Sequence, residues 1–291
     1  MSVGASTLAK RSLTSRFGSL VAALIAILWT IPTFGLLVTS FRPEGLIKTT
    51  GWWTFFGDPQ VTLENYRNVL FGSTSQGDLS NYFINSLVIT IPATIAPLVI
   101  ATMAAYAFSF MKWRGRDTVF VIVFAMQIVP LQMSLIPLLR IFSSSFGKDF
   151  PFMSIWVAHT AFALPLAIFL LHNFMAEIPR ELVEAAEVDG AGHVATFLRV
   201  ILPLMVPAIA SFAIFQFLWV WNDLLVGLTF SGGQSLTAPL TARLQSMAGS
   251  RGQDWHLLTA GAFISMIVPL AVFFSLQRYF VRGLTAGSVK G

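Results

Sequence analysis

The chain contains no cysteine among its 291 residues. Disulfides, thiolate metal sites and thiol nucleophiles are therefore excluded. Charge is also scarce, because Asp, Glu, Lys and Arg make up 11% of the residues, against 55% hydrophobic residues. With a mean hydropathy of +0.74, this composition lies far from that of a soluble domain. The sequence therefore predicts an integral membrane protein.

Two kinds of reactive motif are also missing. No G-x-x-x-x-G-K-[ST] phosphate loop occurs, and the nearest fragment is Gly147-Lys148-Asp149, so the chain cannot hold ATP by this route. No Ser-His-Asp set, histidine cluster or pair of carboxylates falls within one apolar run, which removes the support for a membrane-embedded enzyme. We therefore predict a non-catalytic chain with no cofactor of its own.

Long uncharged runs dominate what is present. Each of six runs exceeds the roughly 20 residues that a membrane helix needs. The runs are Phe17 to Phe41, Leu79 to Met111, Thr118 to Leu139, Phe150 to Ala176, Val200 to Asn222 and Trp255 to Gln277. A seventh, Leu224 to Ala242, carries Ser231-Gly232-Gly233-Gln234-Ser235 in its middle, where turn chemistry outcompetes a helix. We predict an all-α membrane protein, a bundle of six transmembrane helices in a single domain, 1–291.

Every one of the six runs contains proline, so bent or interrupted helices are expected. The first run is too long for the core of a signal peptide and is expected to be retained as a span.

Lysine and arginine indicate the orientation of the bundle. An even number of spans places both termini on one side, and eleven of the 18 basic residues fall on that side. They are Lys10, Arg11, Arg16, Lys112, Arg114, Arg116, Arg180, Arg199, Arg278, Arg282 and Lys290. Cytoplasmic loops carry such an excess, so both termini are predicted to be cytoplasmic. The excess of basic over acidic residues reflects these membrane-flanking cations and indicates no nucleic-acid partner.

An acidic insert, residues 177–202, separates the fourth and fifth runs. Its five carboxylates cannot lie in hydrocarbon without a large desolvation cost; they are Glu177, Glu181, Glu184, Glu187 and Asp189. Pro179 suits the first turn of a helix, and Gly190 suits a left-handed stop. A second segment, about Val194 to Ile201, then leads into the fifth span. Leu182, Val183, Ala185 and Ala186 are expected to form a narrow apolar surface flanked by these carboxylates. These residues alone fit either a cytoplasmic docking element for another protein or an ordinary loop resting on the bundle.

The insert also resembles a known motif. Glu184-Ala185-Ala186, then Gly190, Val200 and Leu202-Pro203 have the spacing of the EAA motif of binding-protein-dependent ABC importer permeases, with valine where isoleucine is usual. Three other stretches are similar to the carbohydrate-importing permeases of the maltose permease G subunit type. They are Leu63-Glu64-Asn65-Tyr66, Asn85-Ser86, and the tail from Gln277 to Gly291.

This resemblance implies a type I ABC importer permease fold in the plasma membrane of a bacterium or archaeon. It implies that the chain forms half of the path for a sugar, with a homologous permease subunit as partner and two ABC ATPase subunits that bind the ATP and magnesium. It also implies that the outer loop, residues 231–256, engages an extracytoplasmic sugar-binding protein. Expected ATPase-coupling residues are Glu184, Ala185, Ala186, Asp189 and Gly190.

An ion-coupled secondary transporter, which needs no ATPase, is the alternative. It should carry ionisable residues in mid-membrane for a proton or sodium relay. His159 is the one candidate within a span, and a lone histidine there is expected to be a packing residue. Energy supplied by another subunit therefore fits the sequence better.

The substrate path is indicated more weakly. In the fifth run, Phe212, Gln216, Trp219 and Asp223 share one helix face, with Asn222 beside them, so rings and polar groups could stack on and hydrogen-bond a sugar. A second polar stripe surrounds Pro130; its members are Gln127, Gln132 and Ser134. The alternatives are an interfacial aromatic belt for the first set and bridges between helices for the second. A neutral, hydroxyl-rich substrate suits these groups best, because no buried charge cluster compensates an ion.

Overall fold

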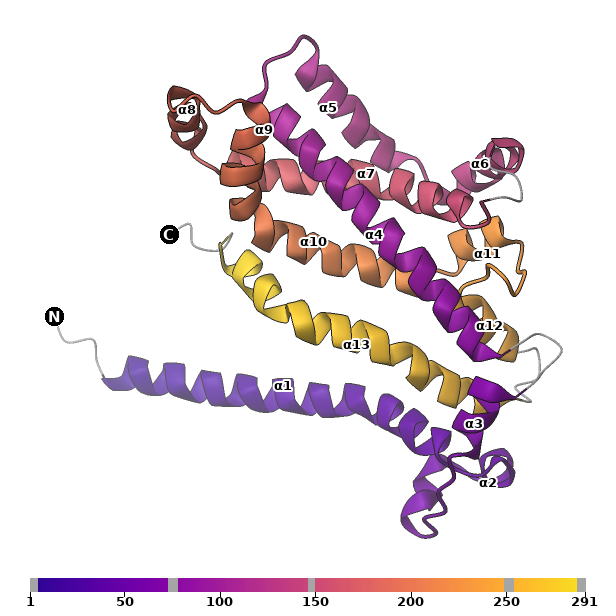
Figure 1. Cartoon of the computed structure of the whole chain (residues 1–291). Coiled ribbons are helices and arrows are strands. Elements are labelled where there is room, and N and C mark those ends of the chain that lie inside the picture. Colours follow the sequence, from indigo (N-terminus) through magenta and orange to yellow (C-terminus); the bar gives the residue numbers. More distant parts are fainter. Residues whose placement is uncertain (1–4, 73–77, 146–149, 249–253, 287–291) are drawn as a thin grey trace. The chain divides into compact units, whose positions relative to one another are not determined.

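The computed structural model describes residues 5–72, 78–145, 150–248 and 254–286 of the chain. Within these residues all regular structure is helical and there is no strand (Figure 1). The chain divides into two compact units, residues 1–72 with 247–263 and residues 73–246 with 264–291. The expected all-α architecture is confirmed.

The first unit contains the N-terminal helix and a small cap. Its elements are α1 (Ala5–Ser40), α2 (Glu44–Thr49), η1 (Trp52–Phe56) and α3 (Glu64–Phe71). Asn65 Nδ2 donates to the carbonyls of Ser40 and Arg42 at 3.0 and 2.8 Å, and Tyr66 shares a hydrogen bond with Ser40 Oγ at 2.7 Å. The Leu63-Glu64-Asn65-Tyr66 stretch thus satisfies carbonyls that the end of α1 leaves without helical donors.

The second unit is a bundle centred on α4, α7 and α10 (Figure 1). Its helices are α4 (Leu79–Phe110), α5 (Arg116–Ala125), η2 (Met126–Ile128), α6 (Leu131–Ser145), α7 (Met153–Ala176), α8 (Arg180–Val188), α9 (His193–Thr196), the π-helical η3 (Phe197–Ile201), α10 (Leu202–Asn222) and α11 (Leu225–Ser231). The helices α12 (Leu240–Ala248) and α13 (Trp255–Ala286) contribute residues to both units.

Small residues hold the centre of the bundle together. Ala101 and Ala105 of α4 are fully buried against Leu171 and Met175 of α7 and Met205 of α10. In a membrane no hydrophobic effect drives helices together, so close approach over small side chains supplies the packing energy. The same core extends to the insert, since Val183 of α8 belongs to it.

Proline residues decide which helices are joined by hydrogen bonds. Pro92 has no N–H for the Val88 carbonyl, and Trp156 Nε1 of α7 donates to that carbonyl at 2.9 Å. Pro97 likewise has no N–H for the Ala93 carbonyl, and Gln216 Nε2 of α10 donates to that carbonyl at 3.1 Å.

The arrangement occurs a third time between α10 and α13. Pro269 has no N–H for the Ser265 carbonyl, and Trp221 Nε1 donates to this carbonyl at 3.0 Å. Inside lipid, no water molecule can donate a hydrogen bond to such a carbonyl. These three side chains therefore tie neighbouring helices together at Pro92, Pro97 and Pro269.

Five described helices are long and apolar enough to span a membrane, and the number becomes six if the bent pair α5–η2 and α6 is counted as one span. The run expected as the third span, Thr118 to Leu139, corresponds to this pair, which bends by 101°, so a bend of the kind expected from proline is confirmed here. Val129 precedes Pro130 and has extended backbone (φ −69°, ψ 119°), as steric contact with a following proline favours. The seventh run does break at its glycines, since Gly232 and Gly233 both have positive φ.

Replacing Trp156 with Phe keeps the ring and removes only the donor to Val88. We expect the free energy of unfolding to fall by about 1–2 kcal/mol, the cost of a carbonyl left without a donor inside lipid. In a Pro92→Ala background the loss should be smaller, because alanine at this position restores the helical N–H. Thermal unfolding of the detergent-solubilised protein gives both values.

Trp29, 78% exposed on α1, provides the matched control, and Trp29→Phe should leave the unfolding midpoint unchanged. Equal losses for Trp156→Phe with and without Pro92 would contradict the role assigned to the indole.

Candidate functional site

The helix α8 ends in a well-formed glycine stop. The Gly190 N–H donates to the Glu187 carbonyl at 3.0 Å, and the Ala191 N–H donates to the Ala186 carbonyl at 2.9 Å. This pair of bonds is the Schellman motif, which needs a left-handed residue at the position of Gly190, where φ is +81°. The expected helix and turn of the insert are confirmed.

The faces of α8 differ from the expected arrangement. Leu182, Val183, Ala185 and Ala186 were expected to form one apolar surface for a partner, but Val183 is 7% exposed and packs in the core of the bundle. Spacing explains the division, because Val183 and Ala186 are three residues apart and share the inward face. The outward apolar face consists of Leu182, Ala185 and Val188, and Val188 is 88% exposed.

Val188 was missed by sequence reasoning, although its spacing of three from Ala185 was a usable signal. An apolar side chain that is nearly fully exposed on an otherwise acidic helix is costly in water. The outward face of α8 is thus suited to contact another protein.

Acidic and basic side chains border the outward face. Glu184 and Glu187 line a cavity of about 320 Å³ together with Lys112, Arg180 and His193. Within the described residues, the Glu184 side chain makes no hydrogen bond and no ion pair. Its carboxylate therefore remains available to a cation supplied from outside the chain.

The insert is joined firmly to the bundle. Tyr106 of α4 shares a hydrogen bond with His193 Nδ1 at 3.3 Å and stacks edge-on against Phe197. From His193 the helix runs without interruption to Asn222, and the π-helical stretch η3 lies where Pro203 would otherwise break the i to i−4 ladder. The segment expected at about Val194 to Ile201 is therefore the first part of the fifth span.

Two cavities on the bundle meet at Trp219. One, of about 500 Å³, is lined by α7 and α10, including Phe212 and Gln216. The other, of about 600 Å³, lies between the bent pair and α7 and includes Gln127 and Ser134. Trp219 lines both and is 46% exposed. The structure thus brings Gln127, Gln216 and Trp219 around adjoining spaces.

The remaining members of the expected path have other partners. Asp223 caps α11, because its carboxylate accepts hydrogen bonds from the N–H groups of Val226 and Gly227 at 3.3 and 2.8 Å. Its Oδ2 also lies 3.7 Å from His159 Nε2, and this buried nitrogen has no hydrogen-bond partner within the described residues. Asn222 Nδ2 donates to the Leu218 carbonyl of its own helix at 2.8 Å. Asp223 and Asn222 line neither cavity.

The outer loop is fixed to the start of α4 by the Asn85-Ser86 pair. Asn85 Nδ2 donates to the carbonyls of Ser235 and Ala238 at 3.0 and 3.1 Å, and Ser86 Oγ accepts from the Leu240 N–H at 2.7 Å. This role was missed by sequence reasoning, which identified the pair only by its resemblance to known permeases. Of the expected loop, residues 249–253 lie outside the described residues, as do residues 287–291 of the expected tail.

Replacing Asn85 with Leu should release the outer loop, because two carbonyls lose their donor. We expect faster hydrogen exchange of the backbone amides in residues 235–240, measured by mass spectrometry on the purified protein. Asn81→Leu, an exposed position on the same helix, should leave these rates unchanged. The same rates in both variants would show that Asn85 does not hold the loop.

Comparison with known proteins places these features in a family. Residues 97–286 match the family model described as "Binding-protein-dependent transport system inner membrane component". The chain is 54% identical to the osmoprotective compounds uptake permease protein GgtD of Synechocystis sp., over 91% of this chain and 89% of that protein. It is 50% identical to the alpha-glucoside transport system permease protein AglG of Rhizobium meliloti, over 88% and 67%.

Among solved structures, a bacterial ABC transporter that imports the acidic polysaccharide alginate contains a similar chain. The TM-score is 0.74 at 17% identity, covering 93% of this chain and 98% of that one. At this identity the likeness concerns the fold, which is that of an ABC importer permease.

Proposed function

Because this chain belongs to the family of binding-protein-dependent transport system inner membrane components, we propose that it couples ATP hydrolysis on separate subunits to the uptake of a neutral glycoside. It is the membrane subunit of an ABC importer and not an ion-coupled secondary transporter, and permease subunits of this kind are non-catalytic. One homologous permease, two ATPase subunits and an extracytoplasmic binding protein complete the proposed assembly. Both termini and α8 lie on the cytoplasmic side in this arrangement.

The observation that carries the coupling role is the outward face of α8. Leu182, Ala185 and Val188 present an apolar strip, and Glu184 beside it has no partner within the described residues. A groove on an ATPase subunit can bury the strip and supply a cation for the carboxylate. The opposite face, through Val183, is part of the core formed by α4, α7 and α10. A displacement of α8 is thereby transmitted to the bundle as rigid-body motion.

Among the expected coupling residues, Ala186 and Gly190 contribute to this role by shaping the end of α8. The Ala186 carbonyl and the Gly190 N–H belong to the stop that sets the end of α8. Ala185 lies on the outward face, where its small size permits close approach of a partner, and the Asp189 side chain is exposed at the turn.

Reversing the charge at Glu184 should weaken docking while leaving the bundle folded. For Glu184→Lys we expect the affinity for the ATPase subunits to fall by at least about tenfold, because a like-charge contact at an interface costs more than about 1.4 kcal/mol. Sugar uptake should fall with it. Co-purification of the ATPase subunits and uptake into vesicles measure the two effects.

Glu177→Lys makes the same charge change in the same insert but outside α8, at an exposed position after α7, and should leave docking intact. Wild-type uptake by Glu184→Lys at equal membrane abundance would remove the coupling role of α8.

The substrate class is supported by the two cavities around Trp219. Both are mainly apolar, with Gln127 and Ser134 among the polar groups that line the larger. An indole face suits the apolar face of a sugar ring, and amide and hydroxyl groups suit its hydroxyls. Among the described residues, no charged side chain lines either cavity, which favours a neutral solute over an ion. Two relatives named for osmoprotective compounds and for alpha-glucosides fit the same class.

Trp219 and Gln127 should therefore set the preference among sugars. For Trp219→Ala and Gln127→Ala in the assembled transporter, we expect a changed ratio of uptake rates between mono- and diglucosides. Leu204→Ala, on the same helix at a 51% exposed position away from both cavities, is the control. Unchanged ratios in both variants would place the substrate elsewhere.

A further inference from the structure

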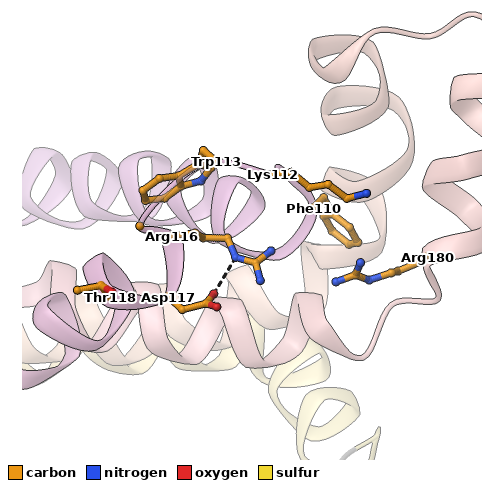
Figure 2. A pocket seen from close by; sticks show the side chains of 8 residues that line it. Phe110, Lys112, Trp113, Arg116, Asp117, Thr118 and Arg180 are labelled. Atoms are coloured by element: carbon orange, nitrogen blue, oxygen red, sulfur yellow. Dashed lines mark hydrogen bonds and ion pairs between the residues drawn. The ribbon is translucent and has the colours of Figure 1, made fainter.

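A cationic cavity lies at the same end of the bundle as α8. Its volume is about 480 Å³, and it is bounded by the end of α4, the connection to α5 and the first residues of α5 and α8 (Figure 2). Lys112, Arg116 and Arg180 line it, against the single carboxylate of Asp117. Three cations with one anion leave this space positively charged.

The positive charges are largely uncompensated by the protein. Arg116 Nε donates to Asp117 Oδ1 at 2.9 Å, whereas Lys112 and Arg180 make no side-chain hydrogen bond or ion pair with the described residues. The guanidinium groups of Arg116 and Arg180 point toward one another in Figure 2. Like charges gathered around one opening repel each other unless an anion lies between them.

Buried polar atoms provide a second, independent observation. An adjoining cavity of about 210 Å³ shares Arg116 and Arg180 and is also lined by Ser109 and His172. Ser109 is 8% exposed, and neither its Oγ nor His172 Nδ1 has a hydrogen-bond partner within the described residues. A buried hydroxyl without a partner is rare and calls for an acceptor. Oxygen atoms of a bound anion would satisfy it.

The surroundings are those of a membrane interface. The cavity lies where the apolar helix α4 ends and α5 begins, and Phe110 and the 39% exposed Trp113 line it. Aromatic rings beside cations at the ends of spans are typical of the headgroup layer, and basic pockets between spans bind anionic headgroups. We propose that this cavity binds the phosphate group of an anionic phospholipid.

A carboxylate of the insert is a weaker occupant. Glu184 and Glu187 line the neighbouring cavity with Lys112 and Arg180, but no ion pair joins these groups within the described residues. Arg116, which lines the proposed site, does not line that neighbouring cavity. The lipid phosphate would instead connect the first residue of α5 to the first residue of α8, which ties the insert to the membrane surface.

Native mass spectrometry of the assembled transporter, released from neutral detergent, tests the site. Phosphatidylglycerol and phosphatidylcholine are titrated separately, and we expect the former to bind with the higher affinity. Arg116→Gln and Arg180→Gln should each weaken phosphatidylglycerol binding by about fivefold, following the energy of one cation near anionic lipid. Ser109→Ala should weaken it as well. Arg114→Gln, an exposed cation of the same connection that lines neither cavity, should not.

Inorganic phosphate is the competing probe. Displacement of phosphatidylglycerol by equimolar phosphate, or phosphate binding without lipid binding, would identify a site for free anions and overturn the lipid proposal. Wild-type lipid affinity in the Arg116→Gln, Arg180→Gln double variant would also overturn it, as would an equal loss in Arg114→Gln. Loss of the ATPase subunits from the double variant with lipid retained would assign the cations to the protein interface instead. Unfolding midpoints of the variants show whether each remains folded.

Discussion

A backbone carbonyl that loses its helical donor inside lipid has to find another one, and this constraint organises the bundle. Pro92, Pro97 and Pro269 each remove one N–H from the ladder. Trp156, Gln216 and Trp221 donate in their place from neighbouring helices. Because each donor must reach one carbonyl, the bonds fix how α4, α7, α10 and α13 are rotated about their axes and where they stand along one another. The prolines thus specify contacts as well as bends.

In the proposed coupling, this fixed bundle is the rigid body on which the insert acts. Val183 places α8 in the core that α4, α7 and α10 share, and Tyr106 holds the start of the fifth span through His193. A helix of nine residues is marginally stable by itself in water. The stability of α8 therefore comes from its packing against the core and from the stop at Gly190. The start of α4 is held in a comparable way, since Asn85 and Ser86 form hydrogen bonds with the loop after α11.

Features set by local chemistry could be predicted from the sequence. The apolar runs, the stop at Gly190 and the break at Ser231 to Ser235 depend on a few neighbouring residues, and all three were confirmed. Features set by packing could not be predicted. The inward face of α8 and the link from Gln216 to Ala93 depend on how the chain packs in three dimensions. The 101° bend at Pro130 lies between these cases, because the proline predicts that the helix breaks but does not predict the angle.

The same distinction narrows the chemistry left for a substrate. Asp223 accepts hydrogen bonds from the N–H groups of Val226 and Gly227, so this carboxylate is engaged with the backbone of α11. Gln216 is likewise engaged with Ala93 although it borders a cavity. Trp219, Gln127 and Ser134 remain around open space. A path lined by a ring, an amide and a hydroxyl offers a solute stacking and neutral hydrogen bonds, and it offers an ion no compensation for its lost hydration. On this proposed path, discrimination among neutral sugars would depend on ring shape and on the hydroxyls that pair with the amide and hydroxyl groups.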